Sequence, residues 1–244
     1  MSEAIATRLA EVRSRIDAAA RGAARDPAGI ELVVVTKTRT PDEIVAAIRA
    51  GARLLGENYV QEARRKIPEV TRALPDSGVR WHLIGPLQTN KAKYVPGSFD
   101  VVESVDREEL ATALAKRAES AGIVLPVLVQ VNVGHEPQKA GVLPERLDEL
   151  LRILAAHPAL AVGGLMAIPP DCDDPTDARP HFRTLARAAR AAAERGLLPA
   201  APVLSMGMSH DFEVAIAEGA TRVRVGTAIF GPRPARETAP VAED

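Results

Sequence analysis

The spacing of hydrophobic residues changes repeatedly between two patterns along the chain. From Ile5 to Ile16 the apolar positions are four, three and four residues apart, which predicts an amphipathic helix over about 2–24. A polar linker then leads to residues 32–35, which are four consecutive large aliphatic residues without alternation. Such a run is typical of a parallel strand that flanking helices bury on both faces.

This unit of a strand followed by a helical pattern recurs to the end of the chain. The predicted strands cover residues 32–35, 53–56, 80–84, 101–105, 125–131, 160–166, 203–205 and 222–225. The helices between them are predicted at 41–50, 59–66, from 88 onwards, 106–121, 144–156 and up to 195. Particular residues set the boundaries: Thr40 is an N-cap before Pro41, Pro68 ends its helix, and Asp106 is a cap.

Eight strand signals of this kind are what a closed α/β TIM barrel, a (β/α)8 barrel, requires. No Gly-x-Gly-x-x-Gly pattern follows the first strand, which argues against a nucleotide-binding open sheet. We therefore expect one barrel domain over residues 1–231 with an extra N-terminal helix. The proline-rich polar stretch 232–244 is predicted to be a disordered tail.

Composition narrows the classes of protein. Aromatic residues are only 3% of the chain while hydrophobic residues are 46%, which suits aliphatic helices on a parallel sheet better than a β-sandwich. The net charge of −1 gives no reason to expect nucleic acid or an anionic membrane as partner. The lone Cys172 offers neither an intramolecular disulfide nor a metal cluster. With no apolar leader at the amino end, we expect a cytoplasmic protein and no metal site.

Lys37 is the first candidate for chemistry, because it follows the first predicted strand directly. The carboxyl ends of parallel strands form the floor of barrel active sites, so a lysine there can serve as a nucleophile. The alternative is that its stem covers the apolar rim and its ammonium group stays in water.

The loops after the seventh and eighth strands are candidates for binding an anion. In barrels this adjacent pair of loops frequently binds phosphate through backbone N–H groups. Gly207 and Gly226 permit close approach of the backbone, while Ser205, Ser209 and Thr227 supply hydroxyl groups. The alternative is a pair of ordinary turns in which Ser209 caps a helix.

Arg222 and Arg224 alternate with valines and so share one face of the eighth strand. An arginine inside the barrel needs a partner, which for Arg222 is expected to be a carboxylate near the bottom, while Arg224 lies nearer the catalytic end. Because the eighth strand closes against the first, the lysine, the anion-binding loops and Arg224 surround one pocket. Together they suit a phosphorylated aldehyde held as a Schiff base.

Several motifs then make a family resemblance specific. In chain order they are VVVTKT, GENYVQEA, WHLIGPLQTNK, GLMAIPP and LSMGMSHDFEVAIAEGATRVRVGTAIFG. Over about 32–231 the chain resembles the YggS/PROSC family of pyridoxal-phosphate homeostasis proteins. This resemblance implies a fold similar to the barrel domain of bacterial alanine racemase and pyridoxal 5′-phosphate (PLP) as cofactor.

Carried over by position, the resemblance implies the site residues. Lys37 would hold PLP as an internal aldimine and Arg224 would face the pyridine nitrogen. The expected phosphate ligands are Ser205, Ser209, Gly226 and Thr227. The full set of expected cofactor-binding residues is Lys37, Asn58, His82, Ser205, Gly207, Ser209, Arg224, Gly226 and Thr227. Asn58 and His82 would line the pocket, although His82 also suits an ordinary strand histidine beside Trp81.

The resulting hypothesis is a monomeric cytoplasmic barrel that binds PLP for intracellular PLP homeostasis, without an established catalytic residue or turnover. Related B6 vitamers and transient PLP-dependent apoenzymes are candidate partners. Two alternatives stay open: a PLP-dependent amino-acid racemase and a Schiff-base aldolase. A cofactor chromophore in the purified protein would separate the aldolase from the other two.

Overall fold

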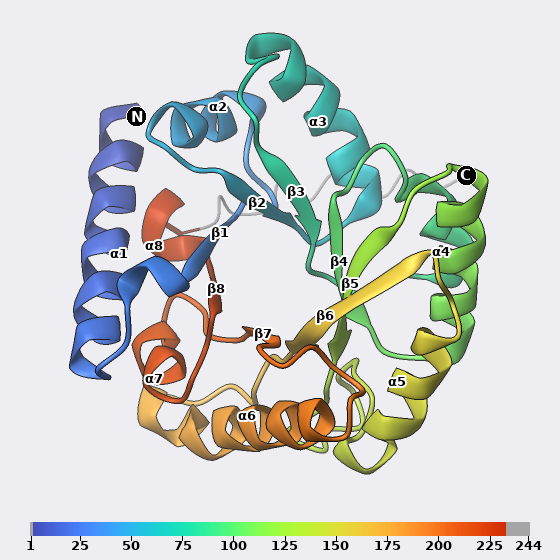
Figure 1. Ribbon diagram of the computed structural model, residues 1–244. Helices are drawn as coiled ribbons and strands as arrows, with labels where there is room; N and C mark the ends of the chain where they lie inside the picture. The colour runs from blue at the N-terminus through green and yellow to red at the C-terminus, as the bar shows by residue number, and fades with distance from the viewer. Residues whose placement is uncertain (1, 233–244) are drawn as a thin grey trace, which may run out of the picture.

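In the computed structural model, which describes residues 2–232, eight parallel strands form a closed barrel inside a ring of helices (Figure 1). Each strand pairs with its neighbours in the sequence, and β8 pairs with β1 to close the barrel. The strands are β1 (Glu31–Val35), β2 (Leu54–Glu57), β3 (Arg80–Leu83), β4 (Val101–Val105), β5 (Leu125–Gln130), β6 (Leu160–Met166), β7 (Val203–Ser205) and β8 (Arg222–Val225). The predicted TIM barrel is confirmed, and each predicted strand is present within one or two residues of its expected bounds.

The helices lie outside the barrel and connect successive strands (Figure 1). The α-helices are α1 (Ser2–Gly22), α2 (Pro41–Arg49), α3 (Val60–Ala73), α4 (Glu108–Ser120), α5 (Leu147–Ala155), α6 (Arg179–Glu194), α7 (Phe212–Ala217) and α8 (Thr227–Phe230). Short 3-10 helices are η1 (Pro27–Gly29), η2 (Thr89–Tyr94), η3 (Pro144–Arg146) and η4 (Pro175–Ala178).

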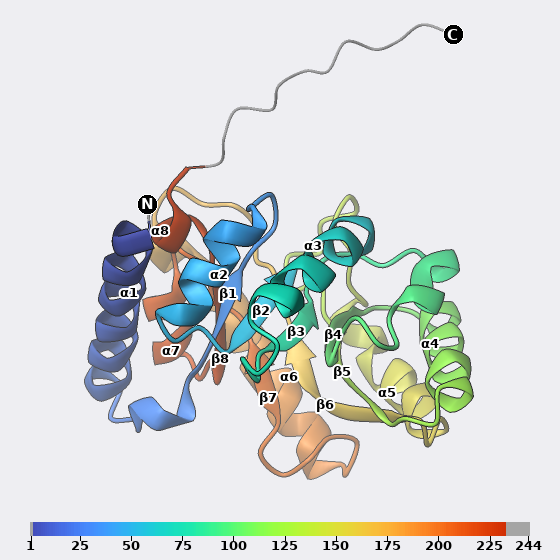
Figure 2. The same cartoon turned by 90° about the horizontal axis from the view of Figure 1, so that it is seen from above.

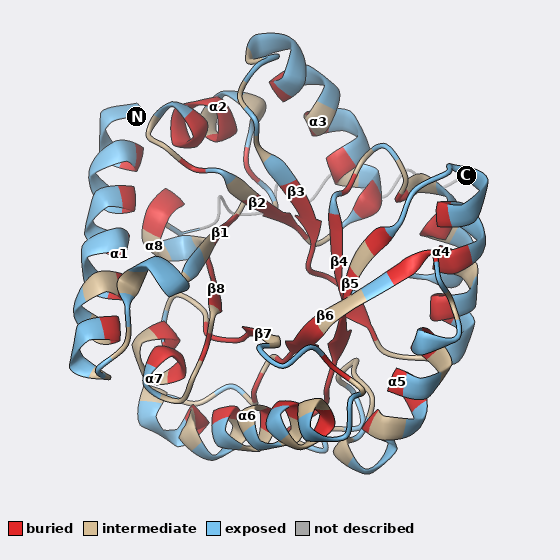
Figure 3. Ribbon diagram, viewed as in Figure 1, coloured by how far each residue is buried: buried red, intermediate tan, exposed pale blue. Residues whose placement is uncertain are grey.

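The core follows from the two hydrophobic periods in the sequence. Strand residues such as Val33 and Val34 are fully buried, and every residue of β4 is buried. The surrounding helices turn their buried residues inwards, as Figure 3 shows by the red bands on the inner faces. Parallel strands covered on the outside by helices and packed on the inside by side chains are buried on both faces, so the polar residues inside the barrel need partners.

The extra N-terminal helix α1 lies outside the barrel next to α2, α7 and α8 (Figures 1 and 2). Its buried residues include Ile5, Leu9, Val12 and Ile16, which form the predicted apolar stripe. Arg15 adds an ion pair with Glu213 of α7, at 2.5 Å. This helix therefore covers the side of the barrel where the last strand meets the first.

Three predicted boundaries were wrong. Helix α3 continues through Pro68 to Ala73 instead of ending there, since Val70 is buried and anchors the last turns. Between β3 and β4 the chain forms only the 3-10 helix η2. Asp106 does not cap α4: its carboxylate binds Arg107 Nη1 at 2.5 Å. An ion pair with the adjacent residue thus replaced the cap that the sequence suggested.

The next three features are a membrane-spanning helix, a metal site and the C-terminal tail. Within 2–232 no helix is long and apolar enough to cross a membrane. The same part of the chain holds no group of three or more acidic, histidine or cysteine side chains suited to a metal ion. The predicted disordered tail, 232–244, lies outside the described residues except for Pro232.

Candidate functional site

The site is built at the carboxyl ends of the strands, beginning with the turn after β1. Lys37 is half-buried in this turn, one residue beyond the fully buried Thr36. The turn then enters α2 through a capping box, in which the Thr40 hydroxyl accepts from the Glu43 N–H and the Glu43 carboxylate accepts from the Thr40 N–H. Because both ends of the turn are fixed, Lys37 has a defined place at the mouth of the barrel.

The turn after β8 lies directly against the end of β1. A Cβ atom added at Gly226 would be 3.1 Å from Val35 Cβ and 3.2 Å from Val35 O. Only a residue without a side chain allows the two segments to come this close. The structure therefore brings Gly226 and Thr227 next to the segment that carries Lys37, as the closure of the barrel predicted.

Ser209 joins the loop after β7 to the turn after β8. Its Oγ accepts hydrogen bonds from the N–H groups of Gly226 and Ala228, both at 3.3 Å. Ser209 is not the cap of α7, since that helix begins at Phe212 with Asp211 in the cap position. The two predicted anion-binding loops are thus connected to each other through a hydroxyl group.

Gly207 shapes the first of these loops. Its φ of +93° lies in the left-handed region, and an added Cβ would be 2.6 Å from Ala215 Cβ. A side chain at this position would be strained and would also clash with α7. Its carbonyl oxygen accepts from the Arg224 N–H, at 2.9 Å, so the loop is held against β8.

Arg224 is buried inside the barrel with both ends of its guanidinium group bonded. Nη1 donates to Ser205 Oγ and Nη2 donates to the Ala167 carbonyl, each at 2.8 Å. Burial lowers the pKa of Arg224, while the charge of Glu103 acts in the opposite direction. Ser205 is itself fully buried and donates to Glu103. Arg224 is therefore held rigidly, with Ser205 as one of its supports.

Glu103 of β4 is the centre of this buried network. His82 Nδ1 lies 2.6 Å from Glu103 Oε1, and Arg222 Nη1 donates to the same oxygen at 3.0 Å. Burial alone would raise the pKa of Glu103, but the hydrogen bond with His82 and the charges of Arg222, His82 and Arg224 outweigh it and lower the pKa to about 2. Arg222 also binds Glu31, at 2.6 Å, so its expected carboxylate partner is confirmed.

Some buried polar atoms at this end of the barrel lack a hydrogen-bond partner among the described residues. They include Asn58 Oδ1, which follows β2, and His82 Nε2, which lies in β3. Glu57 Oε2 is a third, and burial raises the pKa of Glu57 against the charge of Lys66. A bound ligand with polar groups can supply the missing partners, because unpaired buried polar atoms are costly.

Sequence reasoning missed Glu103, although a signal was present. A glutamate stands in the middle of the otherwise apolar strand β4, and the inward arginines required a carboxylate partner. The sequence also suggested no role for Lys66, which is buried on α3 and ion-paired with Glu57. No periodic pattern marks that contact, because its partner is on another element.

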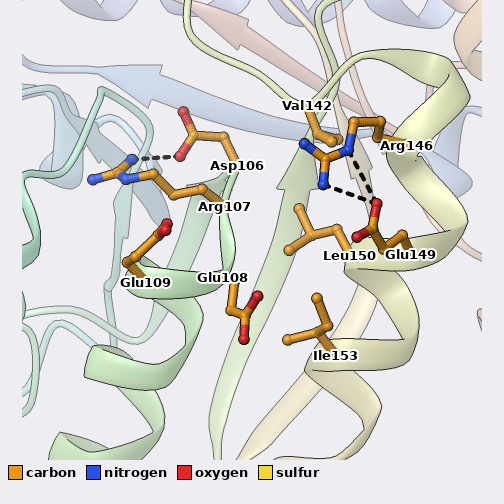
Figure 4. Close-up of a pocket in the computed structure, with 9 residues that line it drawn as sticks. All are labelled: Asp106, Arg107, Glu108, Glu109, Val142, Arg146, Glu149, Leu150 and Ile153. Atoms are coloured by element: carbon orange, nitrogen blue, oxygen red, sulfur yellow. Dashed lines mark hydrogen bonds and ion pairs between the residues drawn. The ribbon is translucent and has the colours of Figure 1, made fainter.

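A small hollow on the outside of the barrel does not coincide with these residues. Figure 4 shows this hollow, of about 150 Å³, between α4 and α5. Charged side chains such as Glu108 on α4 and Glu149 on α5 line it together with the apolar Leu150 and Ile153. None of the predicted cofactor-binding residues lines it. Since the buried polar network lies inside the barrel and the connected loops at its mouth, we assign the site there and not to this hollow.

Comparison with known proteins identifies the family. A family model described as the alanine racemase N-terminal domain matches residues 7–234. A pyridoxal phosphate homeostasis protein from Aquifex aeolicus is 46% identical over 226 residues, which cover 93% of this chain and 97% of that protein. The chain belongs to the pyridoxal phosphate homeostasis protein family. The family member from Escherichia coli is 43% identical over 229 residues and is covered to 97%.

Solved structures agree with this family assignment. PipY from Synechococcus elongatus, solved with PLP bound, has a TM-score of 0.81 at 36% identity, covering 93% of this chain and 100% of PipY. Alanine racemase from Corynebacterium glutamicum has a TM-score of 0.70 at 16% identity, covering 97% of this chain and 63% of the racemase. The racemase comparison shows that the two proteins share a barrel fold. The resemblance inferred from the motifs is thus confirmed at the level of the family.

Proposed function

We propose that this protein binds pyridoxal 5′-phosphate at the mouth of the barrel and serves intracellular PLP homeostasis. The observation that carries the proposal is the contact of Ser209 Oγ with the N–H groups of Gly226 and Ala228, next to the turn that bears Lys37. A lysine beside connected anion-binding loops suits a ligand that has both an aldehyde and a phosphate. The relatives from Aquifex aeolicus and Escherichia coli are both named pyridoxal phosphate homeostasis proteins, which supports this proposal.

The phosphate is assigned to the two connected loops. The bonds to Ser209 Oγ, at 3.3 Å, are longer than the usual 2.9–3.0 Å or so of an N–H···O bond. Phosphate oxygens are stronger acceptors than a hydroxyl, so these N–H groups can turn to the ligand while Ser209 donates its own proton. The exposed Thr227 supplies a second hydroxyl group.

Ser205 has a different role in this proposal from the one that the sequence suggested. Its side chain is fully buried, and its hydroxyl group lies between Arg224 and Glu103. A phosphate contact would require it to leave both partners. We assign Ser205 to supporting Arg224, while Asn58 and His82 offer their unpaired atoms to the ring side of the pocket.

Arg224 favours binding and retention over catalysis. When bound, the cofactor supplies an aldehyde that condenses with amines and a ring that can withdraw electrons. A permanently charged guanidinium facing the ring nitrogen disfavours its protonation, and this makes the ring a weaker electron acceptor. We therefore place a PLP carrier ahead of an amino-acid racemase, and a Schiff-base aldolase last. B6 vitamers and PLP-dependent apoenzymes as partners, a monomeric state and a cytoplasmic location belong to the same proposal.

The attachment point tests the proposed function. Protein purified with PLP is reduced with borohydride, digested and mapped by mass spectrometry. The cofactor mass is expected on the peptide that contains Lys37 and is lost in Lys37→Ala. The matched variant Lys91→Ala should keep it. Cofactor on Lys91 or Lys139 in the wild-type protein would contradict the assignment.

A further inference from the structure

Lys66 is a buried cation outside the predicted set of site residues. It lies on α3 with 7% of its surface exposed. Its Nζ contacts three oxygen atoms: Glu57 Oε1 at 2.6 Å, Glu62 Oε1 at 2.8 Å and the Thr36 carbonyl at 2.7 Å. An ammonium group has three protons to donate, so these contacts satisfy it fully. Lys66 thereby ties α3 to the ends of β1 and β2.

Glu62 extends the same contacts to the other side of Lys37. Its Oε1, which binds Lys66, also accepts the N–H of Thr38 at 2.5 Å. The residue before Lys37 is thus bound by Lys66, and the residue after it by Glu62. One ion pair on α3 holds both neighbours of the candidate nucleophile.

Thr38 needs such support because its backbone is strained. Its φ of +63° lies in the left-handed region, which L-residues rarely adopt. A branched side chain makes this conformation especially unfavourable, and it persists only where the surroundings enforce it. The bond from the Thr38 N–H to Glu62 is such a constraint. Without it, the turn can relax and change the direction in which Lys37 projects.

We propose that Lys66 and Glu62 form a clamp that fixes the direction of the Lys37 side chain. They are positioning residues, since they act through the backbone of Thr36 and Thr38. The inference rests on the proposed function, in which Lys37 takes up PLP covalently. In that step Nζ forms a bond to the aldehyde carbon and the aldehyde oxygen leaves as water. The clamp raises the rate of this step by keeping the amine in place beforehand.

Removing the clamp and relieving the strain should have opposite effects on cofactor uptake. Full-length protein freed of PLP is mixed with PLP, quenched with borohydride at intervals, and the modified Lys37 peptide is quantified. Glu62→Ala is expected to slow uptake by roughly tenfold, which is about 1.4 kcal/mol of barrier. Thr38→Gly adopts the turn without strain, so Glu62→Ala combined with Thr38→Gly should recover most of the rate. Glu69→Ala, an exposed glutamate of the same helix, should react like the wild-type protein.

Thermal unfolding separates positioning from general stability. It is measured for all variants in parallel, because a positioning role changes the uptake rate at temperatures where every variant is fully folded. Uptake by Glu62→Ala at the wild-type rate would overturn the clamp, as would a double variant as slow as Glu62→Ala.

A readout that needs no cofactor distinguishes failure of the clamp from failure of the proposed function. Amide hydrogen exchange of Thr38 is followed by NMR in PLP-free protein. The clamp predicts faster exchange in Glu62→Ala and unchanged exchange in Glu69→Ala. If the wild-type Lys37 takes up no PLP, the proposed function is wrong, and the Thr38 exchange rate then decides the clamp: acceleration supports it and an unchanged rate overturns it.

Discussion

Glu103 shows how a single buried carboxylate organises the interior of the barrel. Its two oxygens are shared among His82, Ser205 and Arg222, and through Ser205 they hold Arg224. A carboxylate without these partners would be protonated in such a place, because burial disfavours its charge. The network therefore keeps both a negative charge and a fixed guanidinium group below the mouth of the barrel.

Because of this network, the free energy of unfolding depends on pH in the acidic range. The pKa of Glu103 is lowered from 4.5 to about 2, so between these values the unfolded chain binds a proton that the folded protein does not. Stability from Glu103 is present above about pH 4.5 and is lost as the pH falls towards 2, by about 3 kcal/mol in total. Urea unfolding across this range should show a steeper loss for the wild-type protein than for Glu103→Gln. Parallel curves for the two proteins would contradict this explanation.

At the residue scale, sequence reasoning succeeded where position along a strand decides the environment. Lys37 follows a buried strand, and Arg222 and Arg224 alternate with valines, so their places at the barrel mouth and in its interior were predictable. The hydrogen bonds of Ser205 were not, because its partners come from β4 and β8. The contacts of Glu62 and Lys66 with the Lys37 turn were missed for the same reason.

At the scale of elements, α3 shows tertiary packing overriding a local signal. Pro68 has no N–H to donate to the Arg64 carbonyl, which ordinarily ends or kinks a helix. Here Lys66 and Val70 are both buried, on either side of Pro68, and the helix continues to Ala73. The proline is unfavourable for the helix, as the sequence indicates, but the tertiary contacts that compensate for it leave no pattern in the sequence.

Replacing Pro68 should therefore stabilise the protein. Pro68→Ala is expected to raise the free energy of unfolding by about 1–3 kcal/mol, since alanine restores a helical hydrogen bond and removes a steric clash. The greater freedom of the unfolded chain offsets part of this gain. Chemical denaturation compares Pro68→Ala with Glu69→Ala, an exposed neighbour in the same helix. A less stable Pro68→Ala protein would show that the ring itself supports the packing.

At the scale of the whole molecule, the barrel and its closing helix were predictable from periodicity. Eight buried strands alternating with helices allow few other arrangements, and the stripe from Ile5 to Ile16 required an apolar surface to cover. The sequence did not show which surface this would be. The structure places α1 beside α2, α7 and α8, so the two ends of the described chain stabilise each other.

The stability of the barrel should therefore depend strongly on α1. Leu9 has 1% of its surface exposed, and Leu9→Ala is expected to cost about 2–5 kcal/mol by leaving a cavity under the helix. The matched change Leu143→Ala, at a leucine that is 41% exposed, should have little effect. Thermal and urea unfolding measure both variants. Equal, small losses in the two would mean that α1 is only loosely attached.

The position of α1 also affects how the protein folds during its synthesis on the ribosome. This helix is made before α7 and α8, which complete the cover over its apolar stripe about two hundred residues later. At a synthesis rate of about 5–20 residues per second, the part of the stripe that α7 and α8 cover stays exposed for roughly 10–40 s. During that time the nascent chain exposes part of an apolar surface, which consists of Ile5, Leu9, Val12 and Ile16. We therefore expect α1 to dock fully only after α7 and α8 have been made.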